Sequence, residues 1–106
     1  MLALNELNIR ITRGDTAWLM IQLSGDVPAD GTEAVITLKR GQLEATPIWV
    51  KREQVRGGVV TLRLANEDTE LPLGAYRWDM RLKMDGEIVT PFTPRRFEVV
   101  EAVGDA

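Results

Sequence analysis

The side chains of this sequence that could do chemistry are carboxylates gathered at two points of the chain. The first group is Asp26, Asp30 and Glu33, and the second is Glu67, Asp68 and Glu70. Carboxylate oxygens are the ligands that calcium prefers, but neither group has the alternating Asp-x-Asp-x-Asp-Gly pattern of a calcium loop. Acidic residues in turns mostly cap the backbone and stay solvated. We therefore expect no metal site.

The sequence contains few other side chains that could act in catalysis. A glycosidase-type pair remains conceivable because carboxylates far apart in sequence can meet, yet Asp79 and Glu98 alternate with apolar residues and are expected on a solvated face. The sequence has no histidine and no cysteine. The usual general base, the commonest zinc ligand and thiolate chemistry are therefore missing together. We expect a protein that is not an enzyme and has no cofactor.

The tripeptide Arg13-Gly14-Asp15 is the one that integrin receptors read on adhesive proteins. An integrin site needs the tip of a long loop. Here one strand is expected to end near Thr12 and the next to start at Thr16, which leaves a connection of about three residues. Gly14 supplies a permissive φ and Asp15 can cap a turn. The sequence favours a structural turn.

Alternation of apolar and polar residues dominates the chain. It is strictest over residues 75–84, where five apolar side chains alternate with four charged ones. Shorter stretches of the same kind cover residues 7–11, 17–23, 34–39, 48–50, 60–64 and 96–100. Asp85-Gly86 predicts a tight hairpin, and residues 65–71 one helical turn. Seven or eight short strands separated by turns predict an antiparallel sandwich or barrel.

One segment narrows this choice. Glu70-Leu71-Pro72-Leu73-Gly74-Ala75-Tyr76 has the spacing of a tyrosine corner, in which a hydroxyl folds back onto the turn before its strand. Pro72 and Gly74 would shape the corner, and Tyr76 would open the strand. The segment is a signal of an immunoglobulin-like sandwich and has a structural role only.

Length and charge limit the partners. The chain has 106 residues, the size of a single domain, and a net charge of −3, whereas proteins that hold a phosphate backbone are normally basic. No run approaches the roughly 20 apolar residues of a membrane span, and the opening lacks a signal peptide's basic region. We expect neither a nucleic acid nor a membrane as partner.

Two tryptophans are candidate contact residues. Trp18 and Met20 lie opposite the main apolar set of their strand, and Trp49 lies opposite Ile48 and Val50. An exposed indole can anchor a partner protein or stack on a sugar ring. Alternatively, these strands are packed on both sides, or their faces are assigned the wrong way round. Trp18, Met20 and Trp49 form the predicted interface.

Two motifs together resemble a known family, the immunoglobulin-like domains of phage and prophage tail and baseplate proteins, such as the N-terminal domain of baseplate upper proteins. Those domains tend to open with I-x-R-G-D-T and later carry L-x-x-E-D-T-x-x-L-P-x-G-x-Y-x-Y-D-L-x-L. The matching positions here are Ile11, Arg13, Gly14, Asp15, Thr16, Leu64, Glu67, Asp68, Thr69, Leu71, Pro72, Gly74, Tyr76, Trp78, Asp79, Met80 and Leu82. In the baseplate proteins further segments follow the domain, whereas this chain ends after the last strand, as a one-domain protein or an excised fragment would.

The resemblance implies a structural module of a virion, made in the bacterial cytoplasm and assembled with other phage structural proteins or with itself. We therefore expect a single immunoglobulin-like β-sandwich over residues 1–106 that works in protein–protein assembly. The alternative is a carbohydrate-binding sandwich that uses an exposed tryptophan on a glycan.

Overall fold

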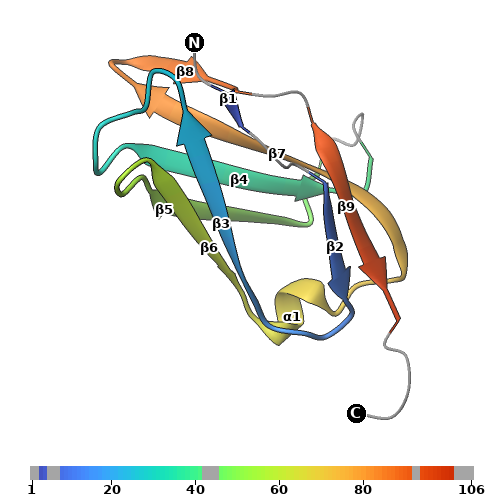
Figure 1. Ribbon diagram of the computed structural model, residues 1–106. Coiled ribbons are helices and arrows are strands. Elements are labelled where there is room, and N and C mark those ends of the chain that lie inside the picture. Colours follow the sequence, from blue (N-terminus) through green and yellow to red (C-terminus); the bar gives the residue numbers. More distant parts are fainter. Residues whose placement is uncertain (1–2, 5–7, 42–45, 92–93, 102–106) are drawn as a thin grey trace.

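The computed structural model describes residues 3–4, 8–41, 46–91 and 94–101, with side chains from residue 8 on. These residues form nine strands and one helical turn (Figure 1). The strands are β1 (Ala3–Leu4), β2 (Ile9–Thr12), β3 (Ala17–Ser24), β4 (Glu33–Lys39), β5 (Trp49–Gln54), β6 (Val59–Leu64), β7 (Gly74–Met84), β8 (Glu87–Val89) and β9 (Arg95–Val100). The helical turn α1 (Asn66–Thr69) lies within the segment predicted to hold one.

The strands form two sheets. The small sheet has the order β1-β3-β6 and the large sheet the order β2-β9-β7-β4-β5, while β8 pairs with β7. The predicted all-β sandwich is confirmed. Nine strands are present rather than seven or eight because the count includes two short strands, β1 with two residues and β8 with three. Every described pair is antiparallel except β2 with β9, which run parallel.

The core lies between the inner faces of the two sheets. In β7 the alternation predicted from the sequence is realised, since Tyr76, Trp78, Met80 and Leu82 are all buried. The other core side chains are Ile11, Ile21, Leu23, Ala34, Ile36, Leu38, Val55, Val60, Leu62, Leu64, Phe97 and Val99. Burial of large apolar side chains of this kind stabilises a fold by about 1.5–3 kcal/mol each, so the core is the main source of stability.

Two turns follow the sequence predictions. Asp85 and Gly86 have φ angles of 49° and 78°, the positive values that a tight primed turn between β7 and β8 requires. Between β2 and β3, Gly14 has a φ of 82° and the Asp15 amide donates to the Thr12 carbonyl at 3.1 Å. Arg13-Gly14-Asp15 is therefore a turn between two strands, as predicted. Within the described residues, no helix is long and apolar enough to cross a membrane.

Candidate interaction surface

The outer face of the small sheet carries two exposed apolar side chains. Ala17, Leu19 and Ile21 point toward the core, so the side chains between them point outward. Trp18 is 67% exposed and Met20 is 73% exposed. This part of the Trp18 and Met20 prediction agrees with the structure: both side chains lie on the surface.

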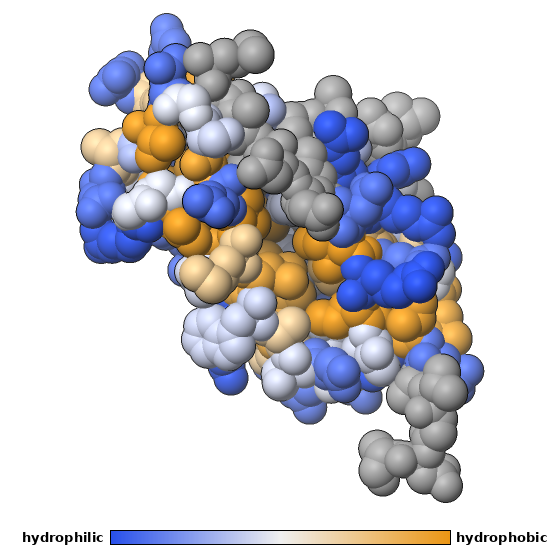
Figure 2. Space-filling model, in the orientation of Figure 1, coloured by the Kyte–Doolittle hydropathy of each residue, from blue (hydrophilic) through white to orange (hydrophobic). Residues whose placement is uncertain are grey.

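The neighbouring strand completes this surface. Trp18 is paired with Arg63 of β6, and Met20 is paired with Thr61. The Arg63 guanidinium carbon lies 5.8 Å from the centroid of the Trp18 ring, within range of a cation–π contact. We call Trp18, Met20, Thr61 and Arg63 the β3 face. Figure 2, drawn in the orientation of Figure 1, shows hydrophobic residues (orange) in the middle of this view and hydrophilic ones (blue) around them.

Trp49 is a different case, and the predicted face of its strand is wrong. Trp49 is half-buried and packs against the core, with its ring edge-on to Phe97 at a centroid distance of 6.2 Å. Its neighbours Ile48 and Val50 are the exposed residues, at 38% and 43%. The reason for placing Trp49 at an interface therefore no longer holds.

The cause lies in the position of β5 at the edge of the large sheet. Trp49, Lys51 and Glu53 are paired with three fully buried residues of β4 and share their inward face. Lys51 and Glu53 therefore share the inward face with Trp49, while Val50 and Arg52 point outward. An apolar pattern alone assigns such a strand the wrong way round.

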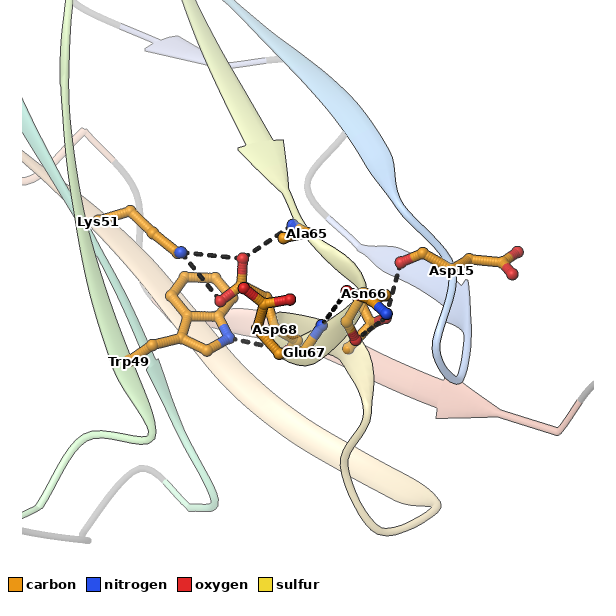
Figure 3. Close-up of polar contacts among 8 residues, drawn as sticks. Asp15, Trp49, Lys51, Ala65, Asn66, Glu67 and Asp68 are labelled. Atoms are coloured by element: carbon orange, nitrogen blue, oxygen red, sulfur yellow. Dashed lines mark hydrogen bonds and ion pairs between the residues drawn. The ribbon is translucent and has the colours of Figure 1, made fainter.

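The close-up in Figure 3 shows what holds Trp49 in place. Its indole nitrogen donates to the carbonyl of Asp68 in α1 at 3.1 Å. The Asp68 carboxylate accepts two hydrogen bonds of 2.9 Å from the Lys51 ammonium and one of 2.8 Å from the Ala65 amide. Asp68 thus joins β5 of the large sheet to the end of β6 in the small sheet, a contact between residues 17 apart in sequence.

The next residue connects α1 to the turn after β2. The Thr69 hydroxyl, which is fully buried, donates to the Asp15 carbonyl at 2.7 Å, and the Gly14 amide donates to the Thr69 carbonyl at 3.4 Å. The Glu67-Asp68-Thr69 segment therefore acts in the fold through Asp68 and Thr69. The turn of Arg13-Gly14-Asp15 is fixed by backbone contacts.

The predicted tyrosine corner is present. The Tyr76 hydroxyl donates to the Pro72 carbonyl at 2.5 Å, and its ring lies 4.7 Å from the Arg40 guanidinium carbon. Gly74, which lies between Pro72 and Tyr76 in the sequence, has a φ of 139°, a conformation that favours glycine. Pro72, Gly74 and Tyr76 thus shape the connection into β7, as expected.

The carboxylates do not converge on a site. Asp30 accepts the Gly57 amide at 2.8 Å, and Glu33 pairs with Arg52 and Lys83 on the sheet surface. The hydrogen bond from Arg52 is the main reason that the pKa of Glu33 lies below its usual value. Over the part of the chain that the structure describes, no three His, Cys, Asp or Glu side chains are grouped so that they could hold a metal ion.

Comparisons with other proteins bear on the fold alone. No protein-family model matches the sequence, and no curated protein does. Among solved structures, the chain is similar to an endo-beta-1,4-mannanase from Thermotoga petrophila, with a TM-score of 0.59 and 12% sequence identity. The match covers 95% of this chain and 20% of that one, so this chain spans a fifth of the length of its structural neighbour. At this identity the likeness supports the sandwich and carries no function across.

Proposed function

We propose that this domain is a non-catalytic assembly module of a phage or prophage particle, of the tail or baseplate type, and that it binds other structural proteins of that particle through the β3 face. The observation that carries the proposal is the exposure of Trp18 and Met20, two residues apart on one strand. Large apolar side chains that remain exposed together on a soluble domain are typical of an interface, and tryptophan is the residue most enriched among those that dominate binding energy.

Two further observations support an assembly role. Asp68, Thr69 and Tyr76, which belong to the motifs that resemble those of tail and baseplate domains, are all used in contacts within the fold. These motif residues therefore stabilise the fold, and other residues form the surface that is available for binding. Arg63 beside Trp18 favours a partner that presents a carboxylate next to an apolar pocket.

The experiment is co-purification with the tail and baseplate proteins encoded by neighbouring genes, using the wild type and a Trp18→Ser/Met20→Ser variant. We expect at least a tenfold loss of affinity in the variant, because truncation of a central interface residue commonly costs about 2 kcal/mol or more. Ile88→Ser is the matched control, since Ile88 is an apolar residue of β8 that is 63% exposed and lies outside the β3 face. Equal binding by wild type and the double variant would refute the proposal.

One observation also favours a second candidate, a carbohydrate-binding module. The Trp18 ring is open to solvent on a sheet face, a platform on which a sugar ring could stack. A glycan array read together with tryptophan fluorescence separates the two functions. Quenching by a glycan that disappears in Trp18→Ser would support the second candidate, and binding to a tail protein without any glycan response would support the first.

A further inference from the structure

The outer edge of β6 carries backbone groups that the fold leaves open. In an antiparallel sheet the N–H and C=O of one residue point to the same side, and successive residues alternate. The Gly58 carbonyl accepts the Leu23 amide of β3, while Val59 exchanges both of its backbone hydrogen bonds with Arg56. Val59, Thr61 and Arg63 therefore direct their backbone groups away from β3.

Both ends of this edge are already occupied. Val59 is bonded to Arg56 at 2.9 and 3.0 Å, and the Ala65 amide donates to the Asp68 carboxylate. Within the described residues, no strand pairs with β6 on this side. Two residues, Thr61 and Arg63, are left with both backbone groups facing outward. An open hollow of about 730 Å³ lies beside Thr61 and is also lined by Val59 and Glu53, among others.

The two neighbouring sheet edges differ in how they are protected. On β5, Lys51 and Glu53 point inward, and inward-pointing charges are a common device against pairing with another chain. The inward residues of β6 are Val60, Leu62 and Leu64, which are all buried and apolar. The β6 edge thus has the features of a strand that accepts a partner, limited to a short stretch by the caps at its ends.

We propose that the β6 edge pairs with the β6 edge of a second copy of this chain, antiparallel and about a two-fold axis at Leu62. This register places Thr61 of each copy opposite Arg63 of the other. It is the symmetric register that gives all eight open N–H and C=O groups of the two copies a partner, since any shift sets Thr61 or Arg63 against a residue that is already bonded.

The chemistry of the edge is compatible with this occupant. A neutral threonine faces each arginine, so like charges are not directly opposite. An interface that repeats the same patch on both copies closes on itself and yields a dimer. The pairing would extend the small sheet of each copy into one continuous sheet, with the two β3 faces side by side. The inference does not depend on what the β3 face binds.

Analytical ultracentrifugation over a concentration series tests the dimer. We expect a reversible monomer–dimer equilibrium with a dissociation constant between about 1 µM and 1 mM, because the paired stretch is short. Thr61→Pro removes a backbone donor from the open edge and should weaken the dimer at least tenfold. Thr61→Val keeps the donor and should not. Circular dichroism checks that both variants fold, as a proline is tolerated where the N–H faces away from the sheet.

The register has a test of its own, because the protein contains no cysteine. Thr61→Cys and Arg63→Cys are made as separate variants and oxidised alone and mixed. A directly opposed pair has a Cα separation of about 5.5 Å, within the range of a disulfide, whereas two copies of either single variant would face each other diagonally at about 7–8 Å. The proposal expects cross-linking chiefly in the mixture.

Three results would overturn the inference: a monomer at every concentration, a dimer that Thr61→Pro leaves unchanged, or cross-linking that is equal in the single and mixed samples. A dimer that dissociates in Trp18→Ser/Met20→Ser and persists in Thr61→Pro would also overturn it, since association would then run through the β3 face. None of these outcomes decides whether the β3 face binds a tail protein, so the two proposals fail separately.

Discussion

The contact between Thr69 and the turn after β2 gives the sharpest prediction about stability. Thr69 is fully buried at the end of α1, and its hydroxyl donates to the Asp15 carbonyl at 2.7 Å. Thr69→Val keeps the branched shape of the side chain and replaces the donor with a methyl group. The variant therefore removes the hydrogen bond to Asp15, 54 residues away in sequence, together with the longer local contact of 3.3 Å to the Asn66 carbonyl.

The size of the effect follows from that environment. A typical hydrogen bond contributes about 0.5–1.5 kcal/mol net, and a buried acceptor that loses its donor adds part of its desolvation cost. Asp15 lies in an exposed turn between two strands, and we take the total at the low end of this range. We expect a loss of about 1–2 kcal/mol in the free energy of unfolding and a fall in Tm of about 5–10 °C for a domain of this size.

Urea and thermal unfolding, followed by tryptophan fluorescence, measure this loss. Thr61→Val is the matched control, because Thr61 is an exposed strand residue and the change should stay within about 0.5 kcal/mol of wild type. Thr69→Ser keeps the hydroxyl donor and loses one buried methyl group. Apart from the cost of that methyl group, Thr69→Ser should be more stable than a variant that lacks the hydroxyl. If Thr69→Val were as stable as Thr61→Val, the turn would be held by its own backbone and by strand pairing, and our reasoning about α1 would be refuted.

Three further predictions concern single side chains. Tyr76→Phe removes the hydroxyl that donates to Pro72 and should cost about 1 kcal/mol in urea unfolding, with the native near-UV spectrum kept. Gly86→Ala forces an alanine to a φ of 78° and should cost about 1 kcal/mol, whereas Gly86→Asn should cost less in the same assay. The Arg96 guanidinium is the main cause that lowers the pKa of Glu98. That contribution to stability is present above the ordinary pKa of a glutamate and is lost as the pH falls through the lowered pKa. A plot of Tm against pH should therefore be flatter in acid for Glu98→Gln than for wild type. A plot for the variant that runs parallel to that of wild type would contradict the assignment.

Features that depend on neighbouring residues were predictable from the sequence. Asp85-Gly86 must turn because positive φ is cheap there, and Pro72, Gly74 and Tyr76 form a corner whose hydrogen bond spans four residues. Strict alternation placed Trp78 in the core because β7 is an inner strand of the large sheet with one solvated face. The outward position of Trp18 and Met20 followed from the same rule.

Features that depend on distant residues were not. Trp49 faces inward because the Asp68 carbonyl accepts its indole N–H and the Phe97 ring packs against its ring. Both partners are distant in sequence, so the residues around Trp49 do not indicate either contact. In the sequence, Asp68 is one of several acidic residues in a predicted turn. In the structure, its carboxylate joins the two sheets. The open edge of β6 depends on which strand becomes its neighbour. Strand order is a property of the topology, which alternation along the chain does not encode.

The parallel pair of β2 and β9 determines how this domain would respond to a pulling force. Ile9 is paired with Phe97 and Thr12 with Val100, and both strands run in the same direction. A load applied to the chain before Ile9 and after Val100 therefore pulls the two strands past each other along their length. Their hydrogen bonds lie across that direction and are strained together, whereas in an antiparallel hairpin pulled from its open end they would break one after another. The parallel pairing of β2 with β9 would therefore resist such a load in shear.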